Sequence, residues 1–214
     1  MRVENEFAKG SEPPVLLLSA RFTSAVDYAR TLHIERRKGS EIPYMAHLLG
    51  VAALVMAEAG HAPIPITEDM VIAALLHDAA EDHGGAARLR DIDYNFGSNV
   101  ARMVDGLSDS LEADPNKKGS WKERKLAYIE RLRGEPADTR IISAADKLYN
   151  ARAILEDYRQ VGPLVWQRFK RGRNDQLWYF VALLEVFKGF GSSRTVEELE
   201  RVVEELGRLS VAEA

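Results

Sequence analysis

The chain has 214 residues, of which 46% are hydrophobic and 29% charged, and its formal net charge is −4 at pH 7. It contains no cysteine, which excludes disulfide scaffolds, thiolate zinc sites, iron–sulfur clusters and cysteine nucleophiles, so any metal must be held by carboxylates and by the five histidines. The mild acidity gives no electrostatic reason to expect a nucleic-acid polymer as partner, and no apolar run reaches the roughly 20 residues of a membrane span, so we expect a cytoplasmic protein.

Residues 1–14 carry no periodic apolar pattern, and we expect a flexible lead-in there. From that point the apolar spacing is helical nearly throughout, and no alternation is long enough for a confident strand. A turn-rich loop is expected at 108–120. The predicted helices cover residues 22–32, 44–59, 70–80, 86–94, 98–107, 121–133, 137–158, 163–170 and 176–187.

The C-terminal segment has the clearest helix pattern. Thr195 and Glu198 have the spacing of a capping box. One face of this helix is apolar and carries Val196, Leu199, Val203 and Leu206. Two heptads are too few for a coiled coil, so docking onto the same domain is favoured, although contact with a second chain in an oligomer is possible. The sequence therefore predicts an all-α domain at residues 15–190 and a C-terminal helix at 191–214 that packs on it or extends it.

The end of the predicted helix at 70–80 has an unusual composition. The stretch before His77 is apolar on nearly all sides, which is typical of a buried helix. His77 and Asp78 follow, and Glu81 and Asp82 come one turn later. Negative charge at a helix C-terminus opposes the helix dipole, and carboxylates repel each other unless a cation compensates them. The pattern therefore favours a metal or catalytic role over a solvated acidic helix end.

Two further candidates lie on other predicted helices. His47 interrupts an apolar stripe, which by itself is more typical of a core histidine. Asp146 lies in an apolar stretch, and a buried carboxylate needs a partner. Its neighbour Lys147 should face elsewhere, whereas Asn150 shares its helix face. Two imidazole nitrogens and two carboxylates would suit an octahedral divalent ion such as Mn²⁺ or Fe²⁺, with positions left for water and substrate.

Four short motifs occur in a fixed order, at residues 36–39, 42–47, 77–82 and 144–152. Together they resemble the metal-dependent HD-domain phosphohydrolases. They are still more similar to the hydrolase half of the RelA/SpoT enzymes and to the small alarmone hydrolases, the group that includes the metazoan SpoT homologue. The resemblance covers about residues 20–190 and implies a single helical HD domain.

This resemblance implies a role for each matching residue. One divalent ion, usually Mn²⁺, would be held by His47, His77, Asp78 and Asp146. Glu81 and Asp82 match the acidic pair that positions and activates the attacking water. Arg37 and Lys38 match a basic pair near the guanine base and the phosphates, and Asn150 matches a contact on the ribose side.

The implied reaction is hydrolysis of the 3′-pyrophosphate of guanosine tetra- or pentaphosphate to pyrophosphate and GDP or GTP. One alternative is a phosphatase that acts on another small nucleotide, such as a nucleoside monophosphate or the 2′-phosphate of NADPH. A second alternative is a non-catalytic nucleotide-binding module, which the complete ligand set with Glu81 and Asp82 disfavours. The basic pair and Asn150 favour the alarmone only through the resemblance.

Two groups of residues have no assigned part in this chemistry. His33, His61 and His83 match no ligand position, so we expect one metal ion and not two. The basic residues between 117 and 125 could close over phosphates, but the pattern favours a solvated helix face.

Overall fold

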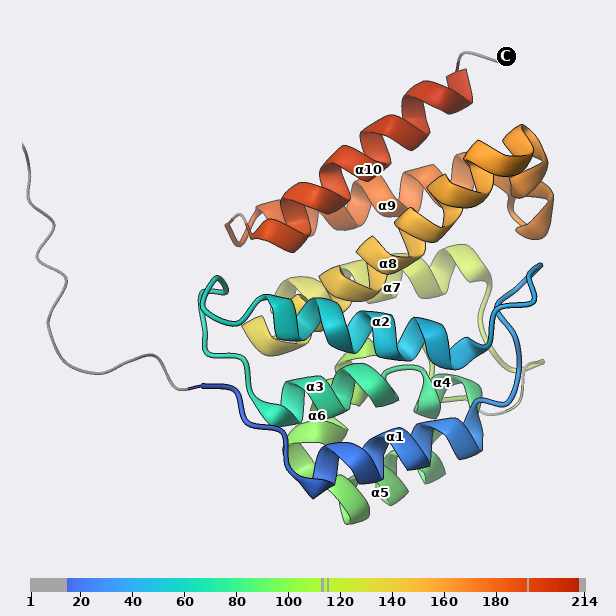
Figure 1. Ribbon diagram of the computed structural model, residues 1–214. Helices are drawn as coiled ribbons and strands as arrows, with labels where there is room; N and C mark the ends of the chain where they lie inside the picture. Colours follow the sequence, from blue (N-terminus) through green and yellow to red (C-terminus); the bar gives the residue numbers. More distant parts are fainter. Residues whose placement is uncertain (1–14, 113, 115, 192, 212–214) are drawn as a thin grey trace, which may run out of the picture.

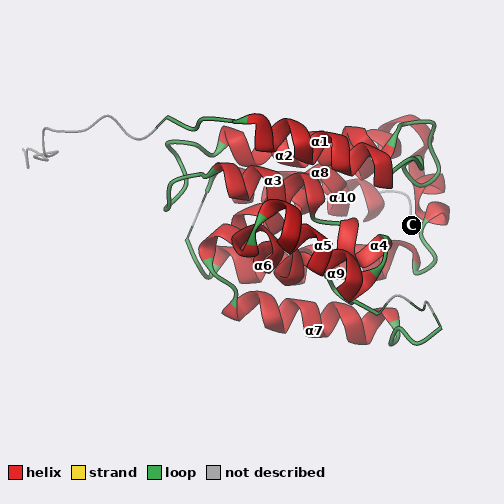
Figure 2. Cartoon of the chain, turned by 90° about the horizontal axis from the view of Figure 1, so that it is seen from below, coloured by secondary structure: helices red, strands yellow, loops and turns green. Residues whose placement is uncertain are grey.

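The computed structural model describes residues 15–211 apart from 113, 115 and 192, so the predicted lead-in at 1–14 lies outside the described residues. The described chain contains helices and no strand, which confirms the predicted all-α fold class (Figures 1 and 2). In chain order the helices are α1 (Ala20–Leu32), α2 (Tyr44–Ala57), α3 (Glu68–Leu76), α4 (Ala79–Asp82), α5 (Gly85–Phe96), α6 (Ser98–Leu107), α7 (Trp121–Gly134), α8 (Ala137–Val161), the 3-10 helix η1 (Gly162–Arg168), α9 (Gly172–Lys188) and α10 (Arg194–Val211).

Two hydrophobic clusters organise these helices, and α8 contributes to both. The first cluster is built by α1 to α6 and takes Ile142 and Ala145 from α8. The second joins α7, η1, α9 and α10 and takes Ala144 and Leu148 from α8. Figure 1 accordingly shows α8 between the lower helices and the pair α9 and α10 above it. Asp146 of α8 therefore lies at the junction of the two clusters.

The long helix predicted at 70–80 is interrupted at the residues of chemical interest. Thr67 caps α3 by accepting a hydrogen bond from the amide of Met70, and α3 ends at Leu76. The His77 ring donates from Nδ1 to the carbonyl of Ala74 at 2.8 Å. An uninterrupted helix would pair that carbonyl with the amide of Asp78, so the ring competes with the helix at this point. A two-residue turn follows, and α4 begins at Ala79.

The connection between α1 and α2 is a tight turn that presents a basic residue. The amide of Arg37 donates to the carbonyl of Ile42 at 2.8 Å, and the amide of Tyr44 donates to the carbonyl of Glu35 at 2.9 Å. Gly39 at its tip has φ = +72°, a left-handed conformation that favours glycine. These bonds fix the direction in which the Arg37 side chain leaves the backbone.

Helix α10 docks on the rest of the chain, against α8 and α9. All four apolar residues of its predicted face, Val196, Leu199, Val203 and Leu206, are buried. The predicted capping box at its start is wrong, because the amide and hydroxyl of Thr195 both donate to the buried Glu58 carboxylate. Ser193 caps the helix instead, by accepting from the amide of Val196 at 3.2 Å. Among the described helices, none is long and apolar enough to cross a membrane.

Candidate metal centre and active site

The four residues predicted as metal ligands converge from three parts of the fold. His47 comes from α2, His77 and Asp78 from the turn between α3 and α4, and Asp146 from α8. His47 Nε2 lies 3.2 Å from His77 Nε2 and 3.3 Å from Asp146 Oδ1. Asp78 Oδ2 lies 3.0 Å from His77 Nε2 and 3.5 Å from His47 Nε2. These nitrogen and oxygen atoms are therefore grouped closely enough to bind one ion.

The hydrogen bonds around this group orient its ligand atoms. Because His77 Nδ1 donates to a backbone carbonyl, Nε2 is the ring nitrogen left to face a metal ion. The Tyr44 hydroxyl donates to Asp78 Oδ2 at 2.6 Å, which holds that carboxylate in place. His47 Nδ1 is buried without a hydrogen-bond partner in the described chain. The donor set of two imidazoles and two carboxylates fits a divalent transition-metal ion.

The same group is strongly polarised electrostatically. Burial alone would lower the pKa of His77, but the carboxylates of Asp78 and Asp146 outweigh burial and raise that pKa well above its usual value. Although burial opposes the change, the two histidines lower the pKa of Asp78, and Lys147 with the same histidines lowers that of Asp146. The carboxylates of Asp78 and Asp146 thus stay ionised with little solvent around them, and the positive charge of protonated His77 compensates them.

Lys147 does not face elsewhere, as the sequence predicted, but forms an ion pair with Asp146 Oδ2. Its flexible side chain can reach the carboxylate of the adjacent residue, and little of the ammonium group's surroundings is solvent, because the Lys147 side chain is 15% exposed. Asn150 donates to Asp146 Oδ1 at 2.5 Å, so Asp146 is held by its neighbour and by the residue one turn later. The prediction that Asn150 shares the face of Asp146 agrees with this contact.

The acidic pair lies on α4, beside the proposed ligands. Burial and the nearby Asp109 raise the pKa of Glu81 to about 7. Burial and Asp78 raise the pKa of Asp82 to about 6. Glu81 Oε2 also accepts a hydrogen bond from the Asp109 amide at 2.9 Å, which fixes the carboxylate. A carboxylate with a pKa near neutrality can accept a proton from water under ordinary conditions.

Several basic residues between 117 and 125 face the site, so the solvated helix face predicted there is wrong for them. Lys125 pairs with the buried Asp109 at 2.7 Å, and Arg124 pairs with the same carboxylate. Lys118 donates to the carbonyl of Glu81 at 3.2 Å. Asp109 attracts these groups from the loop after α6, and nothing in the sequence indicated this role beyond the basic run itself.

Of the three predicted substrate contacts, two reach the site and one lies elsewhere. Arg37 donates from Nη2 to Asn150 Oδ1 at 2.6 Å, and Asn150 in turn contacts Asp146, so both reach the site. Lys38 instead lies over the ring of Phe169, with Nζ 5.7 Å from the ring centre. A polar cavity joins the parts and is lined by Arg37, Tyr44, His47, His77, Asp78, Glu81, Leu107, Asp109, Lys125, Tyr128, Asp146, Lys147, Asn150 and Tyr179.

The chain is similar to known proteins over most of its length. Residues 25–176 match the HD domain family. The guanosine-3′,5′-bis(diphosphate) 3′-pyrophosphohydrolase MESH1 of Mus musculus is 32% identical over 194 residues, which cover 88% of this chain and 96% of that protein. The MESH1 protein of Homo sapiens is 33% identical over 184 residues, which cover 84% of this chain and 90% of that protein.

Solved structures show the same relationship. The structure of a metazoan orthologue of SpoT that hydrolyses ppGpp superposes with a TM-score of 0.70 at 27% identity, over 89% of this chain and 98% of that one. The lmo0812 protein from Listeria monocytogenes EGD-e superposes with a TM-score of 0.61 at 30% identity, over 75% of this chain and 97% of that one. By family match, sequence identity and fold, the chain belongs to the HD-domain family, in the group that contains the MESH1 proteins.

Proposed function

We propose that the chain hydrolyses the 3′-pyrophosphate of guanosine tetra- or pentaphosphate, releasing pyrophosphate and GDP or GTP. The observation that carries this proposal is the convergence of two histidines and two carboxylates beside an acidic pair of raised pKa and an Arg37–Asn150 contact. The MESH1 relatives, whose names state this activity, are matched by this chain over nearly their whole length.

An HD domain binds a divalent metal ion, and the proposed ligands here are His47, His77, Asp78 and Asp146. We favour Mn²⁺, because two nitrogen and two oxygen ligands suit an octahedral ion with positions left for water and substrate. When bound, the ion would supply Lewis-acid stabilisation of the charge that develops on the phosphorus oxygens. His77 would then be neutral, because its Nε2 lone pair would face the ion instead of a proton.

Glu81 is our proposed general base, and Asp82 orients the same water. The Asp109 amide donates to Oε2 of Glu81, and the second oxygen, Oε1, lies 3.9 Å from Nη1 of Arg124. In its ionised form this carboxylate accepts a proton from the water as the water oxygen attacks phosphorus. The bond from phosphorus to the ribose 3′ oxygen breaks, and that oxygen takes up the proton held by Glu81 to give GDP or GTP. Pyrophosphate leaves with the oxygen of the water.

The basic side chains around the cavity would meet the phosphates. Arg37 presents a planar fork for phosphate oxygens, and its contact with Asn150 positions it beside the ligand Asp146. Lys125 lines the same cavity from α7 and is the closest candidate for the remaining phosphate charge. Lys38, which lies over Phe169, is assigned no phosphate contact in this arrangement.

A panel of nucleotides tests the proposal. With Mn²⁺ present, the purified chain should release pyrophosphate from guanosine tetraphosphate, and Asp78→Ala should abolish the release. NADPH and nucleoside monophosphates, assayed for orthophosphate, distinguish the alternative phosphatase. Rapid orthophosphate release from one of these with no attack on the alarmone would replace the proposal, and binding of the alarmone without turnover would support the non-catalytic module.

A further inference from the structure

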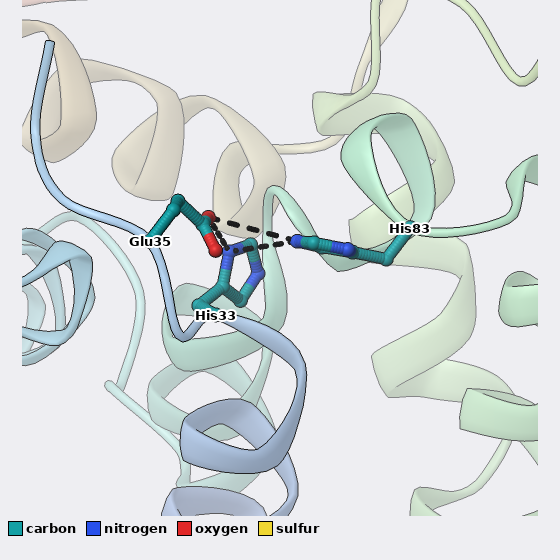
Figure 3. A group of neighbouring side chains, drawn as sticks. All are labelled: His33, Glu35 and His83. Carbon is teal, nitrogen blue, oxygen red and sulfur yellow. Dashed lines mark hydrogen bonds and ion pairs between the residues drawn. The ribbon is translucent and has the colours of Figure 1, made fainter.

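A second group of metal-ligating side chains lies beside the candidate active site and shares no residue with it (Figure 3). His33 follows the end of α1, Glu35 lies two residues further on, and His83 directly follows α4. Figure 3 shows the carboxylate and the two rings turned toward one another. The sequence predicted no ligand role for either histidine, because neither matches a ligand position in the motifs.

The three ligand atoms form a compact triangle. His33 Nδ1 lies 2.8 Å from Glu35 Oε1 and 3.3 Å from His83 Nε2, and His83 Nε2 lies 3.6 Å from Glu35 Oε1. Ligand atoms at about 2.1 Å from a tetrahedral zinc ion are separated by about 3.3 Å. A single ion therefore fits at bonding distance from all three atoms without a change in the backbone.

A proton satisfies this triangle less well than a cation does. His33 Nδ1 lies within hydrogen-bond distance of both Glu35 Oε1 and His83 Nε2, and one proton on Nδ1 serves only one of these two contacts. The His33 ring is buried and reaches both partners with the same nitrogen atom. The ring's other nitrogen, Nε2, is buried without a hydrogen-bond partner in the described chain, so all polar contacts of this ring are made through Nδ1.

The site is reachable from solvent. The His33 side chain is fully buried, whereas those of His83 and Glu35 are 29% and 40% exposed. The buried ring gives one fixed ligand, and the other two leave an opening through which an ion and a water can enter. Zinc sites of two histidines and one glutamate keep such an open fourth position.

We propose that His33 Nδ1, Glu35 and His83 Nε2 form a second metal site for a Zn²⁺-like ion, with a fourth position open to solvent. This site would add a second ion to the single metal ion expected from the sequence. An ion here would join the segment that leads to Arg37 to the turn that directly follows Glu81 and Asp82.

The second site is also in contact with the first through one ring. His33 stacks on Tyr44 with ring centres 4.9 Å apart and planes 10° from parallel, and the Tyr44 hydroxyl donates to Asp78. Resting on the proposed function, we expect this ion to stabilise the arrangement of Arg37 and the acidic pair. Binding of the ion itself does not depend on that function.

The stoichiometry of Zn²⁺ binding tests the site. Chelator-treated full-length protein is incubated with excess Zn²⁺, free metal is removed, and zinc per chain is measured by mass spectrometry. We expect about two ions in the wild type and about one in Glu35→Gln and in His83→Gln, which alter partly exposed residues. The exposed His61 supplies the control, because His61→Gln should keep both ions.

A variant that removes the first site tests ion binding at the second site separately from the proposed function. Asp146→Asn should keep one ion, and the added His83→Gln change should remove it. A wild type that binds one ion, lost in Asp146→Asn and kept in His83→Gln, would overturn the second site and leave the proposed function standing. Equal loss in His83→Gln and His61→Gln would also overturn it.

Discussion

The buried charge of Asp146 is stabilised by side chains of the protein itself. Its two oxygens contact Lys147 and Asn150, and both histidines of the proposed metal centre lie within 3.6 Å of Oδ1. An ionised carboxylate in such a place needs these partners, because burial without them costs several kcal/mol. Lys147 therefore matters for folding, whatever its part in catalysis.

The change Lys147→Met should lower the free energy of unfolding by about 3 kcal/mol, because it leaves a buried carboxylate short of its counter-ion. Lys188→Met is the matched control, since Lys188 pairs with Glu200 at the surface and should contribute less than about 1 kcal/mol. Urea unfolding of the chelator-treated proteins at pH 7 measures both. Equal losses in the two variants would rule out a special role for Lys147.

Glu81 should make the stability of the metal-free protein depend on pH. Its folded pKa is raised from 4.5 to about 7, so it contributes stability below about pH 4.5 that is lost as the pH rises through 7. Glu81→Gln removes this loss. In the metal-free protein, the effect of Glu81→Gln on the free energy of unfolding should therefore be more favourable at pH 8 than at pH 5 by about 2 kcal/mol, roughly 4–8 °C in Tm.

Thermal unfolding at the two pH values, with chelator present, measures this difference. Glu130→Gln, at an exposed position of α7, should give the same small change at both pH values. An effect of Glu81→Gln that does not vary with pH would show that burial does not raise the pKa of Glu81.

At the level of residues, the sequence indicated which polar residues come together at the site, but it did not indicate which charged groups surround them. His47 and Asp146 stand out as polar side chains in apolar stretches, His77 and Asp78 as polar residues at the end of an apolar helix, and the resemblance to the HD-domain family joined the four into one set. Their roles as ligands remain predictions. Lys147 and Asp109 were missed because their importance depends on which groups the fold brings opposite them, and that information is not local in the sequence.

Close helix contact between α2 and α8 positions His47 opposite Asp146. Gly50 of α2 makes this approach possible, because a Cβ atom there would lie 2.0 Å from Cε2 of Tyr149. The ring of Tyr149 in turn packs against His47, with centres 5.1 Å apart. A side chain at position 50 would therefore push on the ring that supports a proposed metal ligand.

Gly50→Ala should lower the free energy of unfolding by about 1–3 kcal/mol through overpacking. It should also weaken metal binding, because Tyr149 must move. Gly207→Ala in α10 is the control, since a Cβ atom there would have no neighbour within 4 Å and alanine should be neutral or stabilise the helix by about 0.5–1 kcal/mol. Chemical unfolding measures both changes, and opposite signs are expected. A stabilised Gly50→Ala would contradict the contact.

Helix positions were predictable from apolar spacing, and helix ends were less so. The spacing indicated one helix across 70–80, but the ring of His77 takes the backbone acceptor that would continue it. Similarly, Thr195 has capping-box spacing, but Glu58, 137 residues away, binds its hydroxyl and amide. In both cases a side chain competes with the local backbone pattern, and a pattern read along the sequence does not contain the competitor.

For the whole molecule, the predicted all-α class is confirmed, and α10 packs against α8 and α9. The sequence could not show that α8 divides its residues between two hydrophobic clusters, because both faces of that helix are apolar. This division brings Asp146 to the junction where α2 and the α3–α4 turn also meet. His33 after α1 and His83 after α4 lie together at the second group of ligands.

The proposed catalytic centre depends on one divalent ion bound at that junction. The direct measurement is the initial rate of pyrophosphate release from guanosine tetraphosphate by chelator-treated protein as Mn²⁺ is added back, in the wild type and in Asp146→Asn. We expect no release without metal, a saturable return of the rate in the wild type, and a flat response in Asp146→Asn. An undiminished rate in chelator, or full reactivation of Asp146→Asn, would show that this junction is not the catalytic centre.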